Sequence, residues 1–171
     1  MSQVVPHTIA VVVPVYRGET TLTGLVHEIL PHCSAQKTSK GHIYVVKEIV
    51  LVHDHGPDRS DEVIRSLSES FDVVRPVWLS RNFGQHPATI AGLAATGSDW
   101  VVTLDEDGQF NPADIPSLLD EALDARVPLV YGAARTAPPH SGFRNTASSF
   151  TKRVLGKILI GNKMAEFTSF R

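Results

Sequence analysis

Short apolar runs alternate with stretches of helical spacing along most of the chain. The runs are rich in β-branched residues and predict strands at residues 9–16, 47–53, 73–79, 100–104 and 129–131. Apolar residues at intervals of three or four predict helices over residues 22–30, 63–71 and 115–123, and a further helix between Pro87 and Gly97. The strand runs are almost continuously apolar, which is typical of strands covered on both faces.

This repeated order of strand and helix predicts an α/β protein, a three-layer α/β/α arrangement around a mostly parallel sheet. Residues 34–42 predict an exposed loop, and Asn111 followed by Pro112 predicts a helix start. In open α/β sheets, ligands bind outside the carboxyl ends of the strands. The polar residues directly after each strand are therefore the candidates for function.

The most acidic of these positions follows the strand at 100–104. Carboxylates two residues apart on an extended chain point the same way, so Asp105 and Asp107 are expected to converge. Two hard anionic ligands with open positions suit Mg²⁺ or Mn²⁺ bound to substrate phosphates, with Gln109 as a neutral oxygen ligand. The alternative is a solvated acidic turn that precedes the next helix.

Asp54 follows the second predicted strand and lies between His53 and His55. Its carboxylate could accept a hydrogen bond from a nucleobase ring N–H. The three residues could instead bind a metal, although neighbours on a strand face opposite sides, which disfavours binding to one ion. Asp58 or Ser60 could simply cap the following helix.

The turn after the first strand, residues 14–19, has no glycine-rich phosphate loop. The G-x-G-x-x-G spacing of dinucleotide sites is missing there, and the chain contains neither G-x-x-x-x-G-K-[ST] nor G-x-S-x-G. Hydride transfer, P-loop chemistry and serine-nucleophile hydrolysis are therefore disfavoured. A carboxylate-bound cation is the expected means of neutralising phosphates.

Composition indicates a soluble globular protein, and the distribution of charge has two possible interpretations. Of the 171 residues, 42% are hydrophobic and 20% charged, and Cys33, the single cysteine, fits a reducing compartment. The net charge of −2 combines +6 over residues 133–171 with −8 over residues 1–132. The basic end indicates a diphosphate, a lipid phosphate or a membrane surface as partner, or else a solvated helix face. Basic and aromatic residues are not interleaved there, so no nucleic-acid partner is expected.

Several short motifs occur along the chain, namely Val12–Tyr16, the Asp54 turn, Leu79–Gln85, Asp105–Gln109, Tyr131–Arg135 and Phe167–Arg171. They occur in the order seen in family 2 glycosyltransferases, and the chain resembles that family, above all its polyprenol-phosphate sugar transferases. The resemblance covers nearly the whole chain. It implies a Rossmann-like GT-A nucleotide-diphospho-sugar transferase fold, with residues 1–171 as a single catalytic domain.

The resemblance also implies roles for individual residues. Asp54 matches the base-binding aspartate of the family, and Arg135 matches a basic residue near the phosphates. The implied nucleotide-sugar contacts are Pro14, Tyr16, Glu19, Asp54, Arg81, Gln85, Asp105 and Glu106. The implied metal ligands are Asp105, Asp107 and Gln109, and the implied catalytic residues are Asp105, Asp107 and Arg135.

The implied activity is an inverting, metal-dependent transfer of a sugar from a UDP- or GDP-sugar to a polyprenyl phosphate or a glycan hydroxyl. The alternatives are a nucleotide-sugar-binding fragment without turnover, and a metal-dependent phosphohydrolase or nucleotidyltransferase that uses the same carboxylates. The chain carries no recognisable signal peptide and no run long enough to span a bilayer. A cytoplasmic protein, peripheral at the cytoplasmic face of the membrane, is therefore expected.

Two departures from the family pattern stand out. The family usually has two acidic residues at the end of the second strand, and here the first is His53. The final Ser169-Phe170-Arg171 lacks the glycine found in the family motif. Relatives continue into acceptor-binding and membrane-attached segments, so the chain is expected to stop before its acceptor-binding half.

Overall fold

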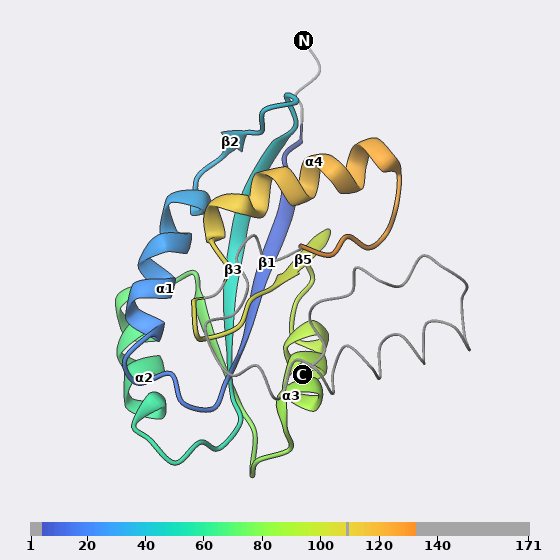
Figure 1. Cartoon of the computed structure of the whole chain (residues 1–171). Helices are drawn as coiled ribbons and strands as arrows, with labels where there is room; N and C mark the ends of the chain where they lie inside the picture. The colour runs from blue at the N-terminus through green and yellow to red at the C-terminus, as the bar shows by residue number, and fades with distance from the viewer. Residues whose placement is uncertain (1–4, 109, 133–171) are drawn as a thin grey trace, which may run out of the picture. The chain divides into compact units, whose positions relative to one another are not determined.

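The computed structural model describes residues 5–108 and 110–132, which fold as an α/β protein (Figure 1). The strands are β1 (His7–Val15), β2 (Gln36–Lys37), β3 (Ile43–His53), β4 (Val74–Trp78) and β5 (Trp100–Thr103). The α-helices are α1 (Leu22–Ile29), α2 (Ser60–Ser70), α3 (Gln85–Ala94) and α4 (Ile115–Ala125). Two short 3₁₀ helices, η1 (Leu30–Cys33) and η2 (Pro112–Asp114), complete the described elements.

The sheet is mostly parallel, as the sequence predicts. β1 lies between β3 and β5 and runs parallel to both. On the side of β3 away from β1, β4 pairs in parallel with the second half of β3. The two-residue β2 pairs antiparallel with the start of β3. Because the four long strands point the same way, the loops after them meet at one edge of the sheet, at the bottom of Figure 1.

The two faces of the sheet bury different helices. Odd-numbered residues of β1, such as Val11, pack with the apolar sides of α1, α2 and α4 in the larger core, together with Tyr44 and Leu51 of β3. The parity changes along β3 because the register with β1 shifts between Val46 and Glu48. Val12 and Val52 face the other side of the sheet and pack with α3 through Ala88. This period-two division explains the continuous apolar strands, because each side chain enters one of two cores. The predicted α/β/α arrangement is confirmed.

Three local predictions differ from the structure or are refined by it. Residues 129–131 were expected to form a strand, but no strand is present there. The loop at 34–42 contains the short strand β2. Asn111 does act as a cap, accepting the N–H of Ala113 at 2.9 Å, but at the start of η2 rather than of α4.

The chain divides into two compact units, residues 1–128 and 129–171. All described helices and strands belong to the first unit. Within the described ranges, no helix combines the length and the apolar character that crossing a membrane demands. The expectation of one domain over residues 1–171 stays a prediction.

Candidate functional site

Four turns converge at the carboxyl edge of the sheet, and hydrogen bonds join them into a ring. We call them the first turn (residues 16–19), the Asp54 turn (54–58), the glycine loop (79–84) and the acidic turn (105–108). They follow β1, β3, β4 and β5, respectively. Each turn holds residues that the sequence predicts to belong to a nucleotide-sugar site. Tyr16 in the first turn and Glu106 in the acidic turn are 90 positions apart in the sequence.

The backbone of the first turn is bound from two sides. The side chain of Glu106 accepts the N–H groups of Tyr16 and Arg17, each at 2.9 Å. The next two N–H groups, those of Gly18 and Glu19, are accepted by Ser60 Oγ at 2.8 Å and by Asp58 Oδ2 at 3.0 Å. Four consecutive amides of this turn are thus fixed by side chains from two other segments.

The Asp54 turn packs directly on the first turn. The N–H of Asp54 donates to the carbonyl oxygen of Val15 at 2.8 Å. At Gly56, a Cβ atom would lie 1.6 Å from the carbonyl oxygen of Tyr16, far inside van der Waals contact. Only glycine permits this approach, so Gly56 is required for the two turns to meet.

The Asp54 carboxylate joins its turn to the glycine loop. Asp54 is 3% exposed, and its two oxygens accept the N–H groups of Phe83 at 2.7 Å and Gly84 at 2.8 Å. Gly84 has a φ of 93°, a conformation that favours glycine, and it directly precedes α3. Asp54 therefore fixes the loop that begins α3; its predicted contact with a base stays a prediction.

The acidic turn closes the ring through Gln85, the first residue of α3, whose Nε2 donates to Asp105 Oδ1 at 2.6 Å. This bond brings together two of the predicted site residues. The turn is not extended, and Gly108 has a φ of 70°. The Glu106 side chain is directed at the first turn, while Asp107 is exposed.

The pKa of Glu106 is raised, and burial is the largest cause. Burial raises the pKa of Glu106, the N–H groups of Arg17 and Tyr16 lower it, and the nearby charges of Asp58 and Asp107 raise it again. The net shift is upward. Removal of the carboxylate from water therefore outweighs the two N–H donors that favour its ionised form.

Other predicted site residues lie around the ring. Glu19 forms an exposed ion pair with Arg59, whose Nη2 lies 2.8 Å from Glu19 Oε1. The Arg81 guanidinium stacks over the ring of Phe83, 4.7 Å from its centroid, and Phe83 is 44% exposed. Pro14 is buried within β1, next to its last residue. Gln109 and Arg135 lie outside the described residues.

The alternative of a metal site at His53, Asp54 and His55 is not supported. Among the described residues, no three His, Cys, Asp or Glu side chains are grouped so as to bind one ion. His53 instead packs against Trp78, with ring centroids 5.4 Å apart. Burial is the largest influence on the His53 pKa and lowers it.

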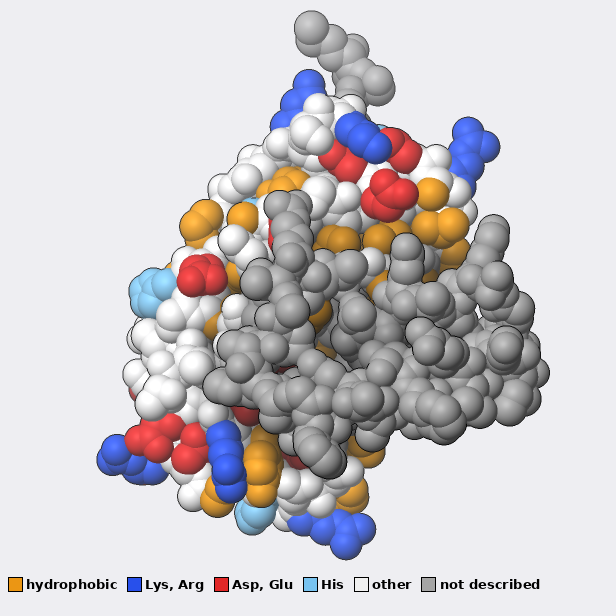
Figure 2. Space-filling view, in the orientation of Figure 1, with side chains coloured by type: hydrophobic (Ala, Val, Ile, Leu, Met, Phe, Trp, Pro, Cys, Tyr) orange, Lys and Arg blue, Asp and Glu red, His pale blue; other side chains and the backbone are white. Residues whose placement is uncertain are grey.

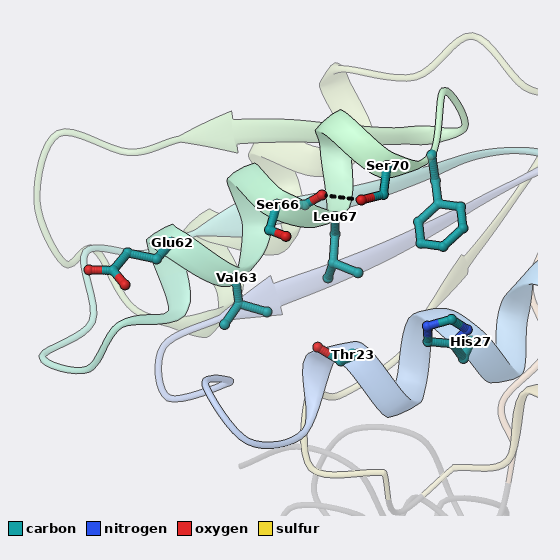
Figure 3. A pocket seen from close by; sticks show the side chains of 8 residues that line it. Thr23, His27, Glu62, Val63, Ser66, Leu67 and Ser70 are labelled. Carbon is teal, nitrogen blue, oxygen red and sulfur yellow. Dashed lines mark hydrogen bonds between the residues drawn. The ribbon is translucent and has the colours of Figure 1, made fainter.

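Charged side chains gather at both ends of the sheet (Figure 2). A separate hollow of about 420 Å³ lies between α1 and α2, away from the ring (Figure 3). Its lining combines hydroxyl groups, Glu62 and an edge-to-face pair of His27 and Phe71. None of the residues that line this hollow belongs to the four turns.

The model of one protein family matches residues 10–170, almost the whole chain; that family is described as glycosyl transferase family 2. The chain belongs to glycosyl transferase family 2. This confirms the resemblance seen in the motifs.

Two relatives are undecaprenyl-phosphate 4-deoxy-4-formamido-L-arabinose transferases. The one from Aeromonas hydrophila subsp. hydrophila is 34% identical over 151 residues, which is 87% of this chain and 43% of that protein. The one from Edwardsiella ictaluri is 36% identical over 160 residues, 93% of this chain and 46% of that protein. The chain thus spans less than half the length of these relatives.

Solved structures confirm the GT-A fold. TarS residues 1–349 of S. aureus superpose with a TM-score of 0.51 at 22% identity, over 68% of this chain and 33% of that one. Glucosyl-3-phosphoglycerate synthase from Mycobacterium tuberculosis gives 0.50 at 27% identity, over 68% and 40%. The matches cover the family 2 fold and not the whole of either protein.

Sequence reasoning missed the two roles that join the ring. It treated Asp58 and Ser60 only as helix caps, although Asp58 Oδ1 does accept the N–H of Ser60 at 3.2 Å. It placed Glu106 only at the ligand, whereas its carboxylate binds the first turn. Neither bond leaves a signal in spacing, because each joins segments about 40 or 90 residues apart.

Proposed function

We propose that the chain is the donor-binding part of an inverting glycosyltransferase that moves a sugar from a UDP- or GDP-sugar to a polyprenyl phosphate. The observation that carries this proposal is the hydrogen-bonded ring of four turns, in which the first turn, Asp54 and the acidic turn face one edge of the sheet. Ligands of open α/β sheets bind at this edge.

Mg²⁺ or Mn²⁺ fits the donor set of the acidic turn. Asp105 and Asp107 would bind it, with Gln109 as the predicted third oxygen ligand, because carboxylate and amide oxygens suit both ions. When bound, the ion supplies positive charge for the leaving nucleoside diphosphate.

Other residues of the ring would contact the base and the rest of the nucleotide. Asp54 would recognise the base, with the Arg81–Phe83 pair beside it, and the first turn would contact the nucleotide through Tyr16 and Glu19. Fixed backbone amides keep these contacts in one geometry and so reduce the ordering cost of binding. Arg135 stays the predicted basic residue near the phosphates.

The acceptor is proposed from the two named relatives, both of which are undecaprenyl-phosphate transferases. A lipid phosphate is already ionised, so its attack on the anomeric carbon needs no general base, unlike attack by a sugar hydroxyl. The basic stretch at residues 133–171 carries a charge of +6 and complements such an anion at the cytoplasmic face of a membrane.

Thermal unfolding with UDP, GDP and their sugars, with and without Mn²⁺, tests the proposal. A ligand at 100 times its dissociation constant stabilises by roughly 2.7 kcal/mol, which raises the Tm of a domain this size by roughly 5–10 °C. We expect such a shift with one nucleotide, abolished by chelator and by Asp107→Ala. No shift with any nucleotide, or one insensitive to chelator, would contradict the proposal.

The products separate the rival activities. Transfer of the sugar to a polyprenyl phosphate would identify a transferase, whereas a phosphohydrolase would release sugar phosphate and nucleoside monophosphate without an acceptor. Metal-dependent binding without turnover would identify the chain as a donor-binding part that needs further residues for transfer.

A further inference from the structure

Glu106 is the middle residue of the acidic turn, yet its side chain contacts a different turn. Its Oε1 accepts the N–H of Arg17 at 2.9 Å. Its Oε2 accepts the N–H of Tyr16 at 2.9 Å and that of Arg17 at 3.2 Å. Both carboxylate oxygens are therefore engaged with the first turn, while Asp105 and Asp107 flank this residue in the chain.

The first turn is shaped to admit this carboxylate. A Cβ atom at Gly18 would lie 3.1 Å from Glu106 Oε2 and 2.6 Å from the side chain of Leu22. Gly18 is buried, so a side chain at that position would displace Glu106 or the start of α1. The close approach of glycine and carboxylate indicates a built contact and not a chance orientation of a surface acid.

The proposed function requires the acidic turn and the first turn to hold one donor together. We propose that Glu106 is a positioning residue that couples these two turns, so that Asp105 and Asp107 keep a fixed relation to the donor contacts of Tyr16 and Glu19. This role rests on the proposed function, and it assigns to Glu106 a task other than the ligand contact expected from the sequence.

The same pair of strands offers a matched control at its other end. Asp99 immediately precedes β5, and its Oδ2 accepts the N–H of Thr8 at 2.9 Å and the hydroxyl of Thr8 at 2.7 Å. Asp99 thus links β5 to β1 through a backbone amide, as Glu106 does, but at the amino edge. Its removal should lower stability without changing nucleotide affinity.

The experiment measures UDP and GDP affinity by calorimetry in saturating Mn²⁺ for the 171-residue chain and four variants. We expect Glu106→Ala and Glu106→Asp to bind the preferred nucleotide roughly 10–100-fold more weakly, the usual loss when a residue that orients metal ligands is removed. Aspartate keeps the negative charge of glutamate, but its side chain is shorter and extends less far toward the first turn. Glu106→Gln keeps one acceptor oxygen and should fall between parent and Glu106→Ala. Asp99→Ala should bind as the parent does.

A second readout separates positioning from general stability. The amide NMR signals of Tyr16 and Arg17 should shift in Glu106→Ala and Glu106→Asp and stay in place in Asp99→Ala. A merely structural role would lower the Tm of the ligand-free variants but leave the affinity of the folded protein unchanged. If Glu106→Ala does not fold, Glu106→Asp and Glu106→Gln decide.

The outcomes distinguish this role from the proposed function. If the parent chain binds neither nucleotide, the proposed function fails and the role of Glu106 fails with it. If the parent binds in a metal-dependent manner and Glu106→Ala or Glu106→Asp binds within twofold of it, only the positioning role is overturned.

Discussion

The two edges of the sheet use their acidic residues differently. At the amino edge, Asp120 on α4 accepts the hydroxyls of Thr38 and Ser39 as well as the N–H of Lys40, while Asp124 pairs with Lys40. At the carboxyl edge, Asp54 and Glu106 accept backbone N–H groups of loops that follow other strands. The first arrangement attaches a helix to a hairpin; the second fixes loops relative to one another.

The pKa shifts at the two edges follow this difference. Burial alone would raise the pKa of Asp120, but the hydrogen bonds from Thr38, Ser39 and the Lys40 backbone outweigh it and lower the pKa. For Glu106, burial prevails and the pKa is raised. The hydrogen bonds to Asp120 thus outweigh the effect of its burial on the pKa, whereas those to Glu106 do not.

The largest predicted effect concerns the contact between the first turn and the Asp54 turn. Gly56→Ala places a Cβ against the backbone carbonyl of Tyr16, which cannot move without displacing the turn. We expect a loss of about 3 kcal/mol in the free energy of unfolding, together with loss of nucleotide binding. Urea unfolding measures the first and thermal shift with nucleotide the second.

Gly24→Ala is the control for this prediction. Gly24 lies in α1 with open space around its Cβ position, so alanine should stabilise the protein by roughly 0.5–1 kcal/mol. Equal unfolding free energies for the two alanine variants would refute the close approach at Gly56.

The next effect tests the comparison between the edges directly. Asp120→Ala leaves the buried Thr38 hydroxyl and neighbouring donors without their acceptor, and Asp54→Ala does the same to two amides of the glycine loop. Each should lower the unfolding free energy by about 2 kcal/mol. Only Asp54→Ala should also weaken nucleotide binding.

The nucleotide affinities of the two variants should be compared at a temperature at which both remain folded, because a loss of stability then does not reduce binding. An Asp120→Ala variant with reduced nucleotide affinity would show that the amino edge is coupled to the site. An Asp54→Ala variant with parental affinity would remove Asp54 from the site altogether.

The sequence predicts the fold better than the connections within the site. The apolar runs of β1 and β3 are long and β-branched, so their place in a buried parallel sheet follows from the pattern alone. Leu129–Tyr131 failed as a strand because three apolar residues satisfy the pattern without a partner strand. The order of the motifs predicts which turns form the site.

The sequence pattern does not indicate in which direction each acidic side chain of the acidic turn points. Asp105 and Asp107 were expected to converge on an extended chain, but a turn begins at Glu106, which contacts the first turn instead. In the sequence, Gly56 and Gly18 look like ordinary turn glycines. The requirement for glycine at these positions is visible only in the folded structure, where backbone or side-chain atoms of other residues occupy the space of a Cβ. Such contacts are tertiary, so one sequence read alone cannot supply them.

The smallest predicted effect belongs to His53, the last residue of β3. Its Nε2 is buried without a hydrogen-bond partner in the described part of the chain, and burial, the largest influence, lowers its pKa below the ordinary 6.5. Above pH 6.5 the ring is neutral whether folded or unfolded, and its contribution to stability is complete. As the pH falls below 6.5, the unfolded chain takes up the proton first, so stability declines until the folded pKa is reached.

His53→Phe keeps the packing against Trp78 and should flatten this decline when unfolding free energy is measured between pH 7 and pH 5. An undiminished slope in the variant would assign the decline to another group, with His32, whose pKa burial also lowers, as the next to substitute.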